Sequence, residues 1–143
     1  MTDKELLEAA ARAAGVACSW AHEDEADYSA KTEGMWLNGA RSPDNSKFWN
    51  PLTDDGDALR LAVKLDIDFY MGADSDGPEA WAGYYVPGRD RKLHACEPIR
   101  KDPYAATRRA IVRAAAAIGS LHNARLTGPQ REAHNSNEEH DHE

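Results

Sequence analysis

Three arginines near the end of the chain form the strongest electrostatic feature of the sequence. Arg108, Arg109 and Arg113 fall in one predicted helix, with Arg109 and Arg113 one turn apart. Guanidinium groups bind phosphate through paired hydrogen bonds, and an aromatic ring such as that of Trp49 stacks on planar bases. One hypothesis is that these four residues bind a small phosphorylated ligand such as a nucleotide. We favour a helix face that pairs with acidic residues of the first two helices, with Trp49 packed in the core.

Two pairs of aspartates have the spacing of sites for a cation or for acid–base chemistry. Asp66 and Asp68 lie on one face of a predicted strand, where two carboxylates can share a divalent cation. No histidine or glutamate accompanies them at a recognisable spacing, so we favour an exposed strand face that discourages edge pairing. Asp74 and Asp76 begin like a calcium loop, but the positions that would need Gly and Glu hold other residues, which favours a turn.

The histidines of the C-terminal segment are the remaining candidates for metal binding. His134, His140 and His142 lie among acidic residues, but their spacing sets no coordination geometry. The sequence also contains no phosphate-binding glycine loop, dinucleotide fingerprint or nucleophile motif. We therefore expect no resident metal, no cofactor and no catalytic residue, and we predict that the protein is not an enzyme.

The distribution of charge indicates the kind of partner. The chain has a net charge of −8; residues 1–88 hold 7 basic and 17 acidic side chains, whereas residues 89–121 hold 8 basic and 3 acidic ones. Proteins that bind long nucleic acids normally present a dominant basic surface, so we expect no such partner. Acidic residues would instead meet a basic patch on another protein. We predict that Asp24, Glu25 and Asp27 bind a partner protein in this way.

The first elements of the chain are a helix and a hairpin. Thr2 and Glu5 have the spacing of a capping box, apolar residues follow at helical spacing, and Gly15 ends the pattern. Short apolar and aromatic runs at residues 16–20 and 35–37 predict two strands. The long acidic segment between them is their connection.

The middle of the chain predicts one helix followed by three strands. Either Thr53 or Asp54 begins the helix. Residues 66–71 alternate with period two, which is typical of a half-buried strand. Strands at residues 81–86 and 93–99 follow after turns that contain Gly and Pro. We expect these strands to form an antiparallel meander.

The last helix has the clearest start signal. Asp102 has the side chain of a helix cap, and Pro103 suits the first helical position. We expect the helix to end at Ile118, before Gly119, with a buried stripe that includes Tyr104.

These elements define an α+β fold class, with a mostly antiparallel sheet packed between helices in the order α-β-β-α-β-β-β-α. Residues 1–121 are expected to form a single α/β sandwich domain, and residues 122–143 a disordered, acidic, histidine-containing tail. Cys18 and Cys96 are expected to be buried thiols rather than a disulfide. The sequence shows neither an apolar stretch of membrane-spanning length nor a leader, which predicts a soluble protein of the cytoplasm.

Two segments resemble a known family. These are WNPLTDDGDAL at residues 49–59 and DPYAATRRAI at residues 102–111, with the alanine-rich run that follows. They are similar to the small bacteriophage and prophage proteins of the phage ABA sandwich domain family. The resemblance covers about residues 2–121 and implies a sheet between helical layers in a phage setting. It implies no catalytic residue, because the matching segments are a helix entry and an amphipathic helix.

We therefore expect a non-enzymatic phage accessory protein that acts by binding and that blocks or redirects a host protein, such as a defence protein. The alternative is a protein that sequesters a small phosphorylated nucleotide signal through Arg108, Arg109 and Arg113. A third possibility is assembly into a homodimer through the alanine-rich helices.

Overall fold

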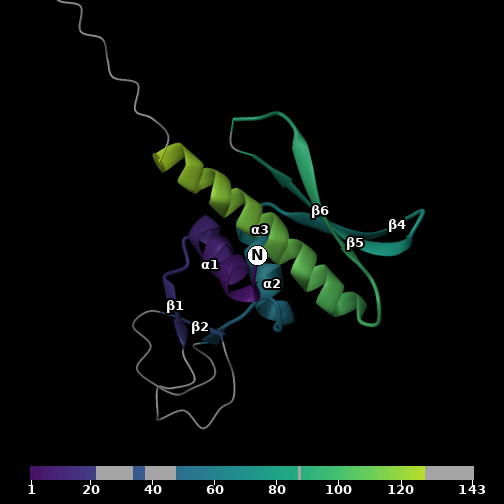
Figure 1. Cartoon of the computed structure of the whole chain (residues 1–143), viewed down its shortest axis with the longest axis horizontal. Helices are drawn as coiled ribbons and strands as arrows, with labels where there is room; N and C mark the ends of the chain where they lie inside the picture. The colour runs from purple at the N-terminus through teal and green to yellow at the C-terminus, as the bar shows by residue number, and fades with distance from the viewer. Residues whose placement is uncertain (22–33, 38–47, 87, 128–143) are drawn as a thin grey trace, which may run out of the picture.

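The computed structural model describes residues 1–21, 34–37, 48–86 and 88–127 (Figure 1). Along the chain its elements are α1 (Asp3–Ala14), β1 (Cys18–Ala21), β2 (Gly34–Leu37), β3 (Phe48–Trp49), α2 (Asp55–Lys64), β4 (Asp68–Asp74), β5 (Gly77–Tyr85), β6 (Lys92–Pro98) and α3 (Pro103–Thr127). The predicted partner-binding residues Asp24, Glu25 and Asp27 lie outside the described residues, as does segment 128–143.

The α+β fold class is confirmed, because antiparallel strands pack against helices. β1, β2 and β3 form one antiparallel sheet, and β4, β5 and β6 form a second in chain order, the predicted meander. Figure 1 shows β1 and β2 beside α1 and apart from the second sheet. The predicted order lacks β3 because its 2 residues are too few to produce a periodic pattern.

Local sequence explains the start and end of α1. The Thr2 hydroxyl accepts a hydrogen bond from the Glu5 backbone N–H at 3.3 Å, and the Glu5 carboxylate accepts one from the Thr2 N–H at 2.6 Å. These bonds confirm the capping box, and they hold the pKa of Glu5 below its usual range. Gly15 ends the helix with φ of 66°, a left-handed conformation that glycine adopts without strain.

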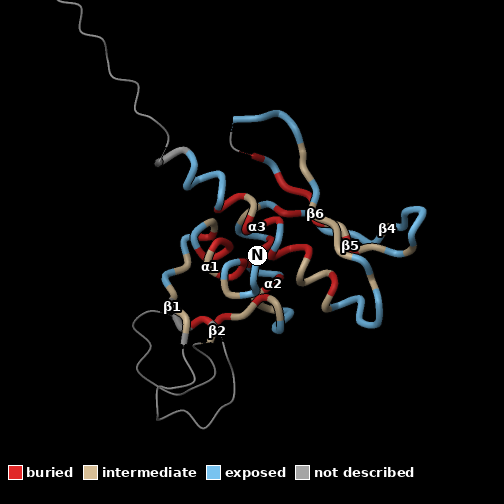
Figure 2. The backbone as a smooth tube through the Cα atoms, in the orientation of Figure 1, coloured by how far each residue is buried: buried red, intermediate tan, exposed pale blue. Residues whose placement is uncertain are grey.

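α3 is the central element of the fold. It contacts the sheet of β4, β5 and β6 as well as α1 and α2, and Figure 2 shows buried residues along much of its length. The consecutive residues 114–116 are all buried, so α3 packs on more than one face. Alanine at these positions lets the neighbouring elements approach closely.

α3 does not end before Gly119, as predicted from the sequence. The helix continues to Thr127 and crosses the expected domain boundary at residue 121. A Cβ atom at position 119 would collide with the backbone carbonyl of Ala9 in α1. Gly119 is therefore the point at which α1 and α3 come closest, and this contact offsets the cost of about 1 kcal/mol for glycine inside a helix.

The start of α3 confirms one prediction and corrects another. The Asp102 carboxylate accepts hydrogen bonds from the backbone N–H groups of Tyr104 at 2.9 Å and Ala105 at 3.2 Å, which makes it the expected cap. Tyr104 was predicted to be buried, and this is wrong because its side chain is 69% exposed. Its place in the first turn puts the ring at the rim of a groove between elements rather than under one.

The pleat of the second sheet separates two kinds of side chain. Ala80, Ala82 and Tyr84 of β5 are buried on the face that α3 contacts. The intervening residue Trp81 lies on the opposite face, where its ring stacks on that of Tyr70 with centroids 6.0 Å apart. The sheet therefore has one face in the core and one face with an aromatic cluster.

Both cysteines are free thiols, so the absence of a disulfide between them is confirmed. Cys18 and Cys96 are half-buried rather than fully buried. Burial raises the pKa of each thiol, which keeps both in the neutral form at physiological pH.

Candidate functional site

A groove of about 520 Å³ opens between α2, the first half of α3 and β4. Its lining is mostly apolar and comprises Asp55, Ala58, Leu59, Phe69, Tyr70, Met71, Tyr104, Thr107, Arg108 and Ile111. Grooves of this size and composition suit the binding of apolar groups.

The large side chains around the groove are unusually exposed. Leu59 is 53% exposed, Phe69 43%, Met71 54% and Tyr104 69%. A single exposed apolar residue is ordinary, whereas several from different elements around one hollow mark an interaction surface. The period-two pattern places Phe69 and Met71 on the same side of the strand as Ile67, but only Ile67 is buried, at 6% exposure. The strand thus leaves the core just where it borders the groove.

An ion pair ties α2 to α3 at one side of the groove. Arg108 donates from Nε to the backbone carbonyl of Leu52 at 2.8 Å and from Nη1 to Asp55 at 2.6 Å. The N-cap of α2 is Asp54, whose carboxylate accepts a hydrogen bond from the Asp57 N–H, so Asp54 rather than Thr53 begins the helix as its cap. Arg108 therefore holds the wall of the groove in place, with its charge compensated by Asp55.

The direction of the backbone in β5 follows from one hydrogen bond. The Ile99 N–H donates to the Pro78 carbonyl at 2.9 Å, so the backbone groups of Pro78 point toward the β6 side. Backbone groups alternate in direction along a strand, so those of Trp81 point toward β4, where Trp81 pairs with Tyr70. Starting from the Tyr70–Trp81 pair, every second residue of β4 therefore forms a hydrogen-bonded pair with β5.

The outer edge of β4 consequently presents backbone groups away from the sheet. The residues between the hydrogen-bonded pairs are Phe69, Met71 and Ala73, so their N–H and C=O groups point outward. Within the described part of the chain, these groups have no hydrogen-bond partner. Phe69 and Met71 therefore offer both an open backbone edge and apolar side chains at the same place.

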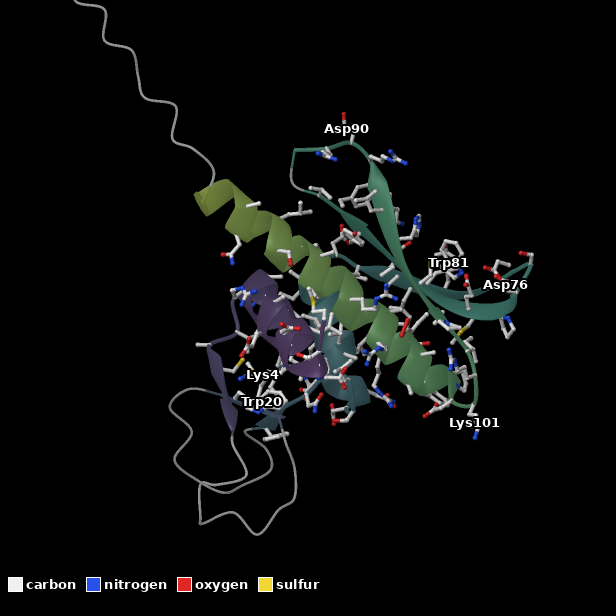
Figure 3. All side chains as sticks on the ribbon, in the orientation of Figure 1. Lys4, Trp20, Asp76, Trp81, Asp90 and Lys101 are labelled. Carbon is white, nitrogen blue, oxygen red and sulfur yellow. The ribbon has the colours of Figure 1, made fainter. Side chains whose placement is uncertain are left out.

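Acidic side chains flank both ends of β4. At the hairpin tip, where Figure 3 labels Asp76, the Asp76 N–H donates to the Asp74 carboxylate at 2.7 Å, which confirms the predicted turn. Burial, followed by the charges of Asp74 and Asp76, raises the pKa of the nearby Glu79. Asp66 and Asp68 lie at the other end of the strand. The open edge of β4 thus has negative charge at both ends, which would attract a basic partner.

The two carboxylates at the start of β4 do not form a metal site. Asp66 precedes the strand with φ of 54°, whereas Asp68 forms an ion pair with Lys92 that passes over Gly83. The hydrogen bond from Lys92 lowers the pKa of Asp68, and Asp68 in turn raises the pKa of Lys92. Among the residues that the structure describes, no cluster of His, Cys, Asp or Glu could hold a metal ion.

Two of the predicted anion-binding arginines are paired within the protein. Arg109 donates to Asp3 at 2.9 Å and lies 3.1 Å from Glu97. Arg113 donates to Glu97 at 2.8 Å and to the backbone carbonyl of Cys96 at 2.6 Å. These contacts fix α3 to α1 and to β6.

The other two residues of the phosphate hypothesis are also engaged. Trp49 is buried at 7% exposure, and β3 pairs it with Met35 of β2, which agrees with core packing. Arg108 is bound to Asp55 of α2, just as Arg109 is bound to α1. The favoured pairing with acidic residues of the first two helices is therefore confirmed for Arg108 and Arg109, whereas Arg113 pairs with Glu97 of β6.

No motif in the sequence predicts the groove directly. Its walls are apolar residues that periodicity assigns to a half-buried strand or to a buried helix stripe, as with Met71 and Tyr104. One available signal is the run of large apolar residues at 69–71 without a Lys or Pro beside it, because protected edge strands usually carry such residues.

Within the described ranges, no helix has both the length and the apolar composition required to cross a membrane.

A scan against protein-family models found no match to this chain, and searches of curated proteins and of solved structures likewise found none. The resemblance to the phage ABA sandwich domain family therefore stays a prediction.

Proposed function

We propose that this protein acts by binding another protein in the groove between α2, α3 and β4, and that it does not catalyse a reaction. The observation that carries the proposal is the group of large apolar side chains, 43% to 69% exposed, around a hollow of about 520 Å³. Burying a fully exposed side chain of this kind contributes about 1.5–3 kcal/mol, and these side chains keep roughly half of their surface exposed, so covering several of them together would favour association.

The polar groups of the groove support a binding role. The charges of Asp55 and Arg108 are paired with each other, and the Thr107 hydroxyl donates to the backbone carbonyl of Pro103 at 2.8 Å. Catalytic acids, bases and nucleophiles need hydrogen-bond partners or altered pKa values that prepare them for reaction. Asp55 and Arg108 instead join α2 to α3, and Thr107 bonds within α3.

The resemblance to phage proteins suggests the biological setting of this binding. In that setting the partner is a host protein, for example a defence protein, and occupation of the groove blocks it. Asp24, Glu25 and Asp27 then remain a second, independent candidate contact for the same partner. The phosphorylated-ligand hypothesis has less support, because its arginines are engaged by Asp3, Asp55 and Glu97.

α2 offers a matched pair of positions for the test. Leu59 and Val63 are both exposed, at 53% and 73%, but only Leu59 lines the groove. A photo-crosslinking amino acid would be placed at each position in turn, in the full chain expressed in a bacterial host. We expect position 59 to give an adduct with one defined protein, lost on adding Phe69→Ser, and position 63 to give none. Equal labelling from both positions, or no adduct from position 59, would contradict the proposal.

A further inference from the structure

We infer that the partner segment is an extended strand with apolar side chains at alternate positions and basic residues at both ends, which adds to the open edge of β4. This inference rests on the proposed function and specifies the chemistry of the partner at the same groove. Three features of the described residues carry it: the direction of the β4 backbone, the position of its side chains and the charges at its ends.

The outward-pointing backbone groups of β4 could form a ladder with one more strand. Phe69 and Met71 point their N–H and C=O groups away from β5, and within the described residues nothing accepts or donates to them. A strand placed beside β4 would use these groups in an ordinary ladder. The hydrogen bonds of the added strand would not require any rearrangement of the existing sheet.

The side chains of β4 determine which face of the added strand is apolar. Phe69 and Met71 also line the groove, so the groove lies beside the same strand whose edge is open. Side chains of a strand alternate between faces, and every second residue of the added strand would point into the groove. The floor that they meet includes Ala58 and Ile111, which are buried and apolar. Alternating apolar residues are therefore required of the partner.

The charges at the ends of β4 determine what flanks the apolar residues. Asp74 and Asp76 lie at one end, and Asp66 and Asp68 at the other, with only Asp68 neutralised by Lys92. An added strand would place its own ends near these carboxylates. Lys or Arg at both ends of the partner segment would be attracted, and Asp or Glu would be repelled.

The same charges argue against a second copy of this chain as the occupant. Two β4 strands paired antiparallel would bring Asp68 of one copy toward Asp74 of the other, at both ends of the pairing. The C-terminal residues 128–143 of the chain do not fit either. They contain 5 acidic residues and no apolar residue larger than Pro.

The test uses the full-length protein and synthetic peptides, with binding followed by fluorescence anisotropy. The probe is an acetylated, fluorescently labelled peptide Lys-Arg-Val-Ser-Ile-Ser-Val-Arg-Lys. The controls are the same peptide with Glu at the four basic positions and a peptide of the same composition with its alternation scrambled. We expect each control to bind at least about tenfold more weakly, since like charge at the ends or loss of the apolar face removes a main source of affinity.

Two substitutions at position 71 separate the contribution of the backbone N–H to peptide affinity from that of the side chain. Met71→Ala removes the side chain from the groove, and Met71→Pro removes in addition an N–H that points outward. Proline is tolerated at such edge positions because the ladder to β5 does not use this N–H. We expect Met71→Pro to bind the basic peptide about three- to tenfold more weakly than Met71→Ala, the value of a lost hydrogen bond. Thermal unfolding of both variants checks that they are folded.

Hydrogen exchange gives a second measurement that does not depend on a variant. In the free protein, the amides of Phe69 and Met71 should exchange quickly and that of Tyr70 slowly. The basic peptide should protect the first two amides and leave the third unchanged.

If the peptide binds without this protection, and Met71→Pro matches Met71→Ala, strand addition is wrong although the groove still binds. If the peptide fails to bind while crosslinking from position 59 succeeds, the partner chemistry is wrong and the proposed function stands; if both fail, neither stands.

Discussion

The two edges of the sheet formed by β4, β5 and β6 are built in opposite ways. At the β6 edge, the carbonyl of Cys96 accepts a hydrogen bond from Arg113 at 2.6 Å, and Pro98 has no N–H to donate. At the β4 edge, Phe69 and Met71 are exposed, and their outward backbone groups are unpaired within the described residues.

This difference between the two edges supports a binding role for β4. Proteins usually protect an exposed edge strand with Pro, Lys or a covering side chain, and β6 has Pro98 and the covering side chain of Arg113. Both strands have 7 residues and belong to one sheet, so length and fold do not explain why only one is protected. An unprotected edge beside an apolar groove agrees with the proposal that a partner completes it.

The largest effect is expected from a substitution that displaces α3, the helix that contacts all three strands of this sheet. Gly119→Val should lower the free energy of unfolding by at least about 3 kcal/mol, because the new side chain collides with Ala9 of α1 and pushes α3 away from it. Ser120→Val is the control, since position 120 is exposed and should change stability by less than about 0.5 kcal/mol. Chemical denaturation measures both, and equal stability of the two variants would mean that the close contact is not structural.

The next largest effect should come from adding a protecting charge to the open edge of β4. Met71→Lys places a charge at the open edge, so we expect a loss of at least about tenfold in affinity for the basic peptide with stability changed by less than about 0.5 kcal/mol. Val63→Lys adds the same charge to an exposed position outside the groove and should reduce the affinity much less. Peptide titration and denaturation of the two variants test this, and an equal loss in both would indicate a general charge effect.

A moderate effect is expected from removing the protection of β6. Arg113→Ala leaves the Cys96 carbonyl without its side-chain donor and should lower stability by about 1 kcal/mol, because the bond is partly exposed. Combined with Pro98→Val, it should also promote association of the protein, which light scattering would detect. If the double variant remains monomeric at concentrations where an opened edge would pair, the cover supplied by Arg113 and Pro98 does not protect the edge.

The smallest effect concerns the ion pair between the two edge strands. Gly83→Ala places a methyl group where Asp68 and Lys92 meet, and it should cost less than about 1 kcal/mol because both side chains are exposed enough to move. The pKa of Asp68 is lowered in the native protein, so the pair stabilises the fold above the usual Asp pKa of about 4 and is lost as pH falls through the lower native value.

An NMR titration of Asp68 would measure this change directly. In Gly83→Ala the pKa of Asp68 should rise toward its ordinary value, and the stability difference from the native protein should vanish in strong acid. An unchanged pKa in the variant would show that the pair re-forms around the methyl group.

Much of the fold is predictable from the sequence because its signals are local. The capping box of Thr2 and Glu5, the left-handed Gly15 and the cap at Asp102 each depend on residues within one turn. The antiparallel meander follows from alternation and turn residues along the chain. The pairing of Arg108 and Arg109 with acidic residues is also predictable in kind, since buried or half-buried charges require partners.

The candidate site is harder to predict, because it depends on which elements meet. Gly119 has the local signature of a helix end, and only the approach of α1 makes it a contact within a longer helix. Tyr104 has the spacing of the buried stripe of α3, but it lies beyond the elements that cover that stripe and is exposed.

The amino-acid sequence by itself determined the α+β class, the caps of α1 and α3, the order of the meander and the free state of both cysteines, because each depends on local backbone preference or composition. Only the tertiary structure decided that β4 is an edge strand, that its apolar residues line a groove with α2 and α3, and that Arg113 covers the opposite edge. The physical reason is that exposure of a strand is set by its neighbours in space, and a period-two pattern is the same whether the next strand is present or absent.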